Sequence, residues 1–300
     1  MSLIDDPESA TLNSTAKAVP AGGSPSQRGW TNLRTWPISL RVGVALLITI
    51  LVILILTPWI APYDPAAQDL ANRLSPSGDG HPLGTDQLGR DVLSRLMWGG
   101  RFSVSIAAIT LAICAVSGTL IGIICARRRG ALDEFVMRVT DILLSFPEMI
   151  VALFLVAILG ANYVTLVIAL VIGGWTPFAR LARGLALEIE PRDFIEAARA
   201  LGCSKAYIML RHVLPNALGP LLAHAALRFG HKLITVGALS FLGLGVQPPN
   251  SDWGSMLADG QPYMVRAPGL VIYPGLAIFI TALSVTLIGR GLGLRRDRQA

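Results

Sequence analysis

Residues 196–216, EAARALGCSKAYIMLRHVLPN, form a polar island between two strongly apolar blocks. The pattern predicts two short helices with a bend between them. The first helix is expected over residues 191–201, because proline is tolerated in a first helical turn and Gly202 suits the left-handed position just past a helix end. Ser204 can cap the second helix, and Pro215 is expected to end it. The apolar blocks on either side predict that membrane helices hold the island in place.

The first of these two helices is amphipathic. Its apolar face is expected to consist of Phe194, Ala197, Ala198 and Leu201, which recur at helical spacing. The opposite face is charged. Small residues at positions 197, 198 and 202 would let another backbone approach closely, as a docking helix requires. The island is therefore a candidate surface for a partner protein.

The order of residues in the island resembles the signature cytoplasmic loop of binding-protein-dependent ABC importer permeases. The matching residues are Glu196, Ala197, Ala198, Gly202, Leu214 and Pro215. In that family the loop forms a coupling helix that sits in a groove of the ATPase subunit, so the resemblance implies that these six residues couple the two subunits. His212 stands where an aliphatic residue is expected, but RHxLPN is typical of the peptide-importing branch. Another amphipathic helix hairpin could give part of the pattern by chance, and the flanking sequence argues against that alternative.

Composition independently predicts a membrane protein. Of 300 residues, 53% are hydrophobic and only 15% are charged, and the mean hydropathy is +0.58. These values are too apolar for a soluble domain of this size. The three cysteines are scattered, which argues against a disulfide framework and against a metal site. None of the three lysines follows a glycine-rich loop as a Walker A motif requires, so any ATP is expected to bind another subunit.

Six segments are expected to cross the membrane. They are residues 42–63, 102–126, a hairpin of two spans between 138 and 180 that turns at 160–162, about 216–246, and 267–289. With both termini in the cytoplasm, the cytoplasmic segments hold 18 of the Lys and Arg residues, the outer loops hold five, and two lie within the fifth span. This asymmetry follows the positive-inside rule and supports the topology.

The topology divides the chain into five parts. They are a disordered cytoplasmic tail (1–35), a first transmembrane helix (36–63), an extracytoplasmic loop with a surface helix (64–101), a five-helix permease core (102–292) and a second cytoplasmic tail (293–300). The core includes a coupling loop, 186–216, and an extracytoplasmic loop, 245–268. Near the cytoplasmic end of the third span, Arg138 and Asp141 are expected to form an ion pair, with Glu148 nearby; a proton relay is the alternative.

Two further segments resemble the dipeptide, oligopeptide and nickel permeases. They are GTDQLGRDVLSRLMWGGR, residues 84–101, and LSFLGLGVQPPNSDWGSMLADG, residues 239–260. Within the first, residues 90–98 are expected to form a short surface helix. Its charged residues are predicted to form structural ion pairs around a glycine turn, in preference to binding substrate. These residues are Asp86, Arg90, Asp91 and Arg95.

A cationic stripe crosses the fifth predicted span. His224, Arg228 and His231 recur at i, i+4 and i+7, within ~60° around a helix, and Lys232 lies beside them. Cations at membrane depth are costly unless they face water or a partner, so the stripe is a candidate lining of the translocation path. The alternative is that these side chains extend to the cytoplasmic surface. The stripe departs from the small, apolar residues that the family usually has here.

The resemblance implies an all-α membrane protein with the ABC type I importer permease fold, located in a bacterial plasma (inner) membrane. It further implies a non-catalytic subunit without a cofactor of its own. The implied partners are a homologous permease, two ATPase domains that bind ATP and Mg, and an extracytoplasmic substrate-binding protein. Peptide is the expected substrate, with glutathione or a nickel chelate as alternatives. A secondary transporter and a membrane-anchored helix-turn-helix DNA binder are the competing classes, and neither accounts for the docking loop between closely spaced spans.

Overall fold

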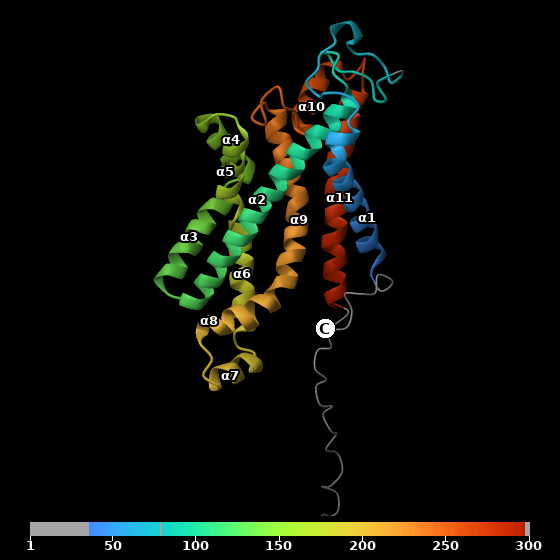
Figure 1. Ribbon diagram of the computed structural model, residues 1–300. Coiled ribbons are helices and arrows are strands. Elements are labelled where there is room, and N and C mark those ends of the chain that lie inside the picture. The colour runs from blue at the N-terminus through green and yellow to red at the C-terminus, as the bar shows by residue number, and fades with distance from the viewer. Residues whose placement is uncertain (1–35, 79, 298–300) are drawn as a thin grey trace, which may run out of the picture. The chain divides into compact units, whose positions relative to one another are not determined.

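The computed structural model describes residues 36–78 and 80–297, so the predicted tail at 1–35 lies outside the described residues. In this part of the chain the regular structure is helical and contains no strand (Figure 1). The longer helices are α1 (Ile38–Ile60), α2 (Val92–Arg128), α3 (Ala131–Ser145), α4 (Glu148–Leu159), α5 (Tyr163–Gly174), α6 (Thr176–Ile189), α9 (Leu214–Phe241) and α11 (Gly269–Asp297). The shorter ones are α7 (Asp193–Ala200), α8 (Lys205–Ile208) and α10 (Trp253–Gly260). The all-α prediction is confirmed for the described residues.

Four helical stretches are long and apolar enough to cross a membrane, namely α1, α2, α5 with α6, and α11. Helices α3 and α4 make a fifth if they count as one span, although they meet at an angle of 87°. The bend falls at Phe146 and Pro147, because proline cannot continue the hydrogen bonding of the preceding helix. The 28-residue α9, which carries the cationic stripe, is not among the candidate spans. The described helices therefore confirm four or five of the six predicted spans.

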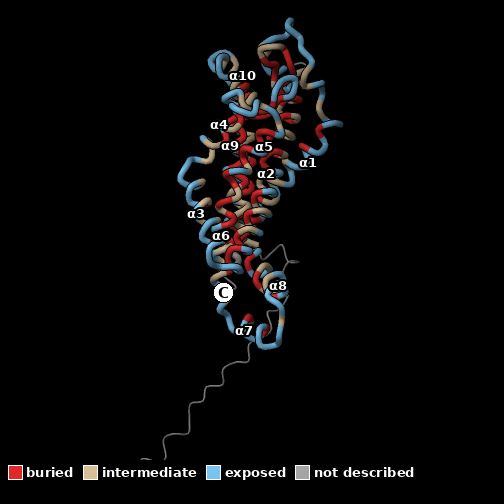
Figure 2. Tube along the Cα trace, turned by 90° about the vertical axis from the view of Figure 1, so that its left-hand side faces the viewer, coloured by how far each residue is buried: buried red, intermediate tan, exposed pale blue. Residues whose placement is uncertain are grey.

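The helix bundle has two ends, which are named here by the short helices that they carry. The α7 end holds α7 and α8, and the α10 end holds α10 and the loop between α1 and α2 (Figure 1). Helix α2 packs along α6, α9 packs against α11 and α2, and α1 packs against α11. Figure 2 shows buried residues gathered along the centre of the bundle, where α2, α6 and α9 lie.

Close contact between α2 and α6 depends on a GxxxG pair. A Cβ at Gly118 would lie 2.3 Å from the Trp175 carbonyl oxygen, and one at Gly122 would lie 2.2 Å from that of Ala179. Small residues of this kind let two membrane helices approach closely, since lipid provides no hydrophobic force to drive them together. Any larger residue would push α6 away and move the island that follows it.

Two local predictions were wrong. Residues 90–98 do not form a separate surface helix, because from Val92 onward they are the first turns of the 37-residue α2. Asp91 caps this helix by accepting a hydrogen bond from the Ser94 N–H at 2.7 Å. Arg138 does not pair with Asp141 either. It lies 3.7 Å from Glu134, one turn earlier, while Asp141 pairs with Arg180 of α6.

Candidate functional site

The polar island folds as two short helices at the α7 end, as predicted. Helix α7 begins at Asp193, two residues later than the predicted start, and Gly202 has the expected left-handed backbone with φ of +78°. The Cys203 N–H donates to the Ala198 carbonyl at 3.1 Å, which closes the helix end. Ser204 caps α8 by accepting from the Tyr207 N–H at 3.2 Å, as predicted.

The predicted apolar face of α7 lies mostly outward. Ile195 and Ala198 are buried, whereas Phe194, Ala197 and Leu201 are exposed. The island thus presents large apolar side chains to the outside, with Leu201 84% exposed. The term docking patch is used here for Phe194, Leu201, Tyr207 and Leu210. Phe194 and Tyr207 both lie near His212, with ring centroids 6.3 Å and 5.9 Å from it. Exposed large apolar groups on a polar segment are typical of a site that a partner covers.

Pro215 does not end the second helix. The chain passes from α8 through a π-helical turn, Met209–Val213, directly into α9. Proline has no N–H and its ring would collide with the carbonyl four residues earlier in a regular helix. The wider π turn relieves that conflict, so proline is accommodated at the start of α9. The island is therefore joined to α9 by continuous helix. Of the other predicted coupling residues, Glu196 is exposed and Leu214 is half-buried.

One carboxylate ties the island to the membrane helices. Glu190 at the end of α6 accepts hydrogen bonds from Arg129 at 2.6 Å and from Arg199 at 2.9 Å. These arginines follow α2 and lie within α7, respectively. The contacts are exposed and individually weak, but they join three helices at the point where the island leaves the bundle. Sequence reasoning missed this junction; Arg199 is only nine positions from Glu190, but Arg129 is 61 positions away, and only the tertiary structure brings it close.

The cationic stripe of α9 meets a carboxylate from α4. Lys232 is 1% exposed, forms an ion pair with Glu148, and donates to the Leu170 carbonyl at 2.9 Å. Arg228 and His231 lie 4.0 Å and 3.8 Å from the other Glu148 oxygen. These four side chains are called the Glu148 cluster. Lys232 is thus held inside the bundle, whereas the His231 side chain of the stripe is 53% exposed.

One sequence expectation about this cluster needs correction. Glu148 was expected near the cytoplasmic end of the third span, but its contact with Lys232 places it in the bundle, alongside the second half of α9. The reason is that α3 begins already at Ala131 and rises ~22 Å before the bend. His224 is not part of the cluster, since its ring packs edge-on against Phe178 with centroids 5.0 Å apart.

A second charged cluster lies at the α10 end and confirms the predicted ion pairs. Asp86 accepts from Arg90 Nε at 2.7 Å and also pairs with Arg95. Both arginines reach Asp259 of α10, at 3.3 Å and 2.9 Å. The four residues are called the Asp86 cluster. Asp259 was missed, because it lies 164 residues from Arg95 and only the tertiary structure brings it close. The predicted fourth member, Asp91, instead caps α2 and contacts His81 at 2.9 Å.

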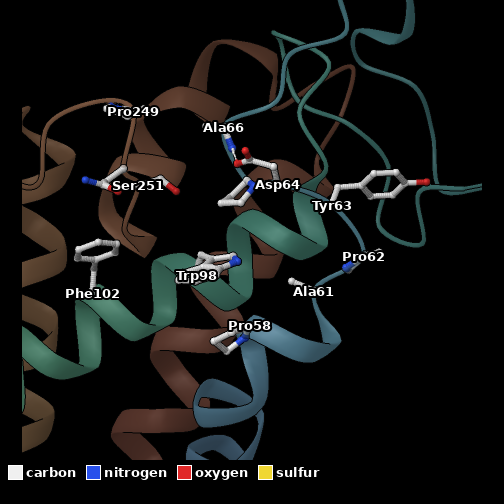
Figure 3. Close-up of a pocket in the computed structure, with 12 residues that line it drawn as sticks. Pro58, Ala61, Pro62, Tyr63, Asp64, Ala66, Trp98, Phe102, Pro249 and Ser251 are labelled. Carbon is white, nitrogen blue, oxygen red and sulfur yellow. Dashed lines mark hydrogen bonds between the residues drawn. The ribbon is translucent and has the colours of Figure 1, made fainter.

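A pocket of about 580 Å³ opens at the same end (Figure 3). Its walls come from the end of α1 and the loop after it, from α2, and from the loop before α10. Trp98 and Phe102 of α2 lie beneath the loop residues Asp64 and Ser251 in this view. Among the described residues, no three His, Cys, Asp or Glu side chains gather as a metal site would require.

Helices long and apolar enough to cross a membrane, together with buried charge within the bundle, are typical of a membrane transport protein. Comparison with known proteins identifies its family. Residues 118–298 match the binding-protein-dependent transport system inner membrane component, and residues 24–76 match the N-terminal TM domain of oligopeptide transport permease C. The first match covers more than half of the chain. The protein therefore belongs to the binding-protein-dependent transport system inner membrane components, the permeases of ABC importers.

Relatives and solved structures agree with this family. A putative peptide transport system permease protein of Brucella suis is 38% identical over 254 residues, covering 85% of this chain and 86% of the relative. The glutathione transport system permease protein GsiD of Shigella sonnei is 36% identical over 270 residues, covering 90% and 89%. An inward-facing structure of the MetNI methionine ABC transporter is similar in fold, with a TM-score of 0.53 at 20% identity over 67% of this chain and 97% of that one.

Proposed function

We propose that this chain is the membrane-spanning permease subunit of an ATP-driven importer for peptides. It forms half of the translocation path, and a homologous permease forms the other half. Two ATPase domains bind and hydrolyse ATP with Mg, so this chain is not catalytic. An extracytoplasmic binding protein delivers the substrate. The observation that carries the proposal is the exposed docking patch on α7 and α8. Helix α8 continues through the π turn into α9, which carries the charged residues.

The proposed topology has six spans. Helices α3 and α4 act as one bent span, and α9 crosses as well, since its 28 residues rise ~42 Å and its charges meet Glu148 within the bundle. The α7 end then lies in the cytoplasm together with both termini. The positive-inside distribution of Lys and Arg supports this orientation. The pocket at the α10 end faces the side from which the binding protein approaches.

In this scheme α7 is the coupling helix. Closure of the ATPase pair moves α7 together with α8 as a rigid body, and the π turn transmits the movement to α9 because helix is continuous from α8 onward. Glu196, Ala197, Ala198, Gly202, Leu214 and Pro215 are the proposed coupling residues. His224, Arg228 and His231 are the proposed path residues.

Replacement of Leu201 tests the coupling role. Leu201→Asp places a charge in the docking patch without disturbing the buried face of α7, so we expect the permease to reach the membrane but to lose most of its bound ATPase on purification. Gly202→Trp should act similarly, because its open left-handed position projects a bulky group outward. Gly184→Ala is a matched control, since an added Cβ there meets nothing within 4 Å. Normal transport by Leu201→Asp would refute this assignment.

Peptide is the proposed substrate because all three sequence motifs fit the peptide branch and because a permease of the peptide class is among the relatives. A permease for glutathione or for a nickel chelate is the second candidate. The relative named as a glutathione permease supports the glutathione alternative. The test is ATP hydrolysis by the complete complex in lipid with its binding protein. We expect stimulation by di- and oligopeptides; a response to glutathione or nickel chelates alone would overturn the substrate and retain the importer.

A further inference from the structure

The Glu148 cluster holds more positive charge than one carboxylate can balance. Lys232 occupies Glu148 by direct contact, whereas Arg228 and His231 approach the second oxygen only to 4.0 Å and 3.8 Å, the limit for an ion pair. A guanidinium in a protein is always charged. The cluster therefore keeps a net positive charge even when the histidine is neutral.

Arg228 also has a hydrogen-bond donor that no described residue accepts from. Its Nε is buried and has no hydrogen-bond partner among the described residues, and the same is true of His224 Nε2, one turn toward the α7 end. A buried donor without a partner is costly, and a buried charge more so. Arg228 is nevertheless 23% exposed and His231 is 53% exposed, so both can be reached from outside this chain.

We propose that Arg228, flanked by His224 and His231, binds a carboxylate of the transported substrate midway along the path. The planar guanidinium donates two parallel hydrogen bonds to a carboxylate, a geometry that lysine cannot provide. Arg228 and His231 lie ~4.5 Å apart along one side of α9 and both are accessible, so a substrate can pass from one to the other. This proposal rests on the proposed function, because an unmodified peptide ends in a carboxylate.

Glu148 gives the site a way to release its ligand. Its free oxygen lies close enough to Arg228 to replace a departing carboxylate, yet too far to form a short ion pair with Arg228. Lys232 keeps the Glu148 carboxylate on the α4 side, because its ammonium pairs with the other Glu148 oxygen and also donates to the Leu170 carbonyl. A site that exchanges one carboxylate for another binds its substrate weakly enough to let it continue, as transport requires.

The test compares uptake of trialanine with uptake of trialanine amide by the complete importer in proteoliposomes, using Arg228→Gln and Arg228→Lys. Any preference of the binding protein for a free carboxylate is the same in every variant and cancels when ratios are compared. Arg228→Gln should lower trialanine uptake about tenfold, the factor expected for one charge-assisted hydrogen bond, and leave the amide unchanged. Arg228→Lys should fall between. Leu222→Ala, at an exposed position on the same helix, is the control.

Three other results of this uptake experiment would overturn the proposal. Equal losses for the two peptides in Arg228→Gln would mean that Arg228 only supports the fold, and the proposal would fail. Unchanged uptake of both would also overturn it. If the wild-type complex takes up neither peptide when ATP is supplied, the proposed function itself is wrong and this proposal with it.

Discussion

The two charged clusters of this protein differ in how their charges balance. In the Asp86 cluster, two carboxylates meet two guanidiniums, and each arginine reaches both partners. In the Glu148 cluster, one carboxylate faces an ammonium, a guanidinium and an imidazole. Balanced charge of the first kind fixes a loop to α10 and leaves no net charge, although Arg95 Nε is buried without a hydrogen-bond partner among the described residues. Excess charge of the second kind, within the helix bundle, is the basis of the carboxylate site that we propose.

The largest effect is expected from breaking the buried pair of the Glu148 cluster. Lys232→Met leaves Glu148 without its close partner, at a cost of about 3–5 kcal/mol in stability. Adding Glu148→Gln should recover most of that loss, because removing both charges of a buried pair is often close to neutral. Thermal unfolding of the detergent-solubilised complex measures both variants, with the half-exposed His231→Gln as control. Equal melting temperatures for the single and double variants would show that the pair is not coupled.

An intermediate effect is expected from the Asp86 cluster, where the two carboxylates differ in burial. Asp86 is buried and accepts from both arginines, so Asp86→Asn should cost about 3 kcal/mol. The Asp259 side chain is 39% exposed, so Asp259→Asn should cost less than about 1 kcal/mol. The same melting experiment compares them. Uptake of peptide at a temperature where both variants are folded should be unchanged, and a specific loss of uptake would assign this cluster a role in the path.

The smallest effect is expected from a buried carboxylate without any cation. Asp252, the cap of α10, accepts hydrogen bonds from Ser240 at 2.8 Å and from the Ser255 N–H at 2.9 Å. Burial raises the pKa of Asp252, and these hydrogen bonds oppose the rise only in part.

The sign of the resulting pH dependence follows from proton binding. Between the unfolded pKa, about 3.9, and the higher folded pKa, the native state binds more protons than the unfolded state, so stability falls as pH rises. Asp252→Asn should remove this contribution, and the stability of the wild type relative to the variant should therefore decline over that window. Melting temperatures of both proteins from pH 4 upward measure the difference. A difference that grows with pH would contradict the expected sign.

Several features of the fold could be predicted from local sequence because they depend on neighbouring residues. The left-handed Gly202 and the Ser204 cap are set by which residues tolerate those backbone conformations. The ion pairs of Asp86 with Arg90 and Arg95 follow from residues within ten positions of one another. Predictions failed where a neighbour in space changed the outcome. Asp141 was expected to pair with Arg138, but it pairs with Arg180 of α6, 39 positions away.

The sequence by itself determined that this chain is a helical membrane permease, because apolar length, charge distribution and the residues of the island are local properties. Only the tertiary structure decided which charges meet. Glu148 and Lys232 are 84 positions apart, as are many pairs that never touch, and their contact depends on the bend between α3 and α4. Because of that bend, Glu148 meets α9 at the level of Lys232 and makes its closest contact with Lys232. Arg228 is therefore left without a carboxylate at short distance.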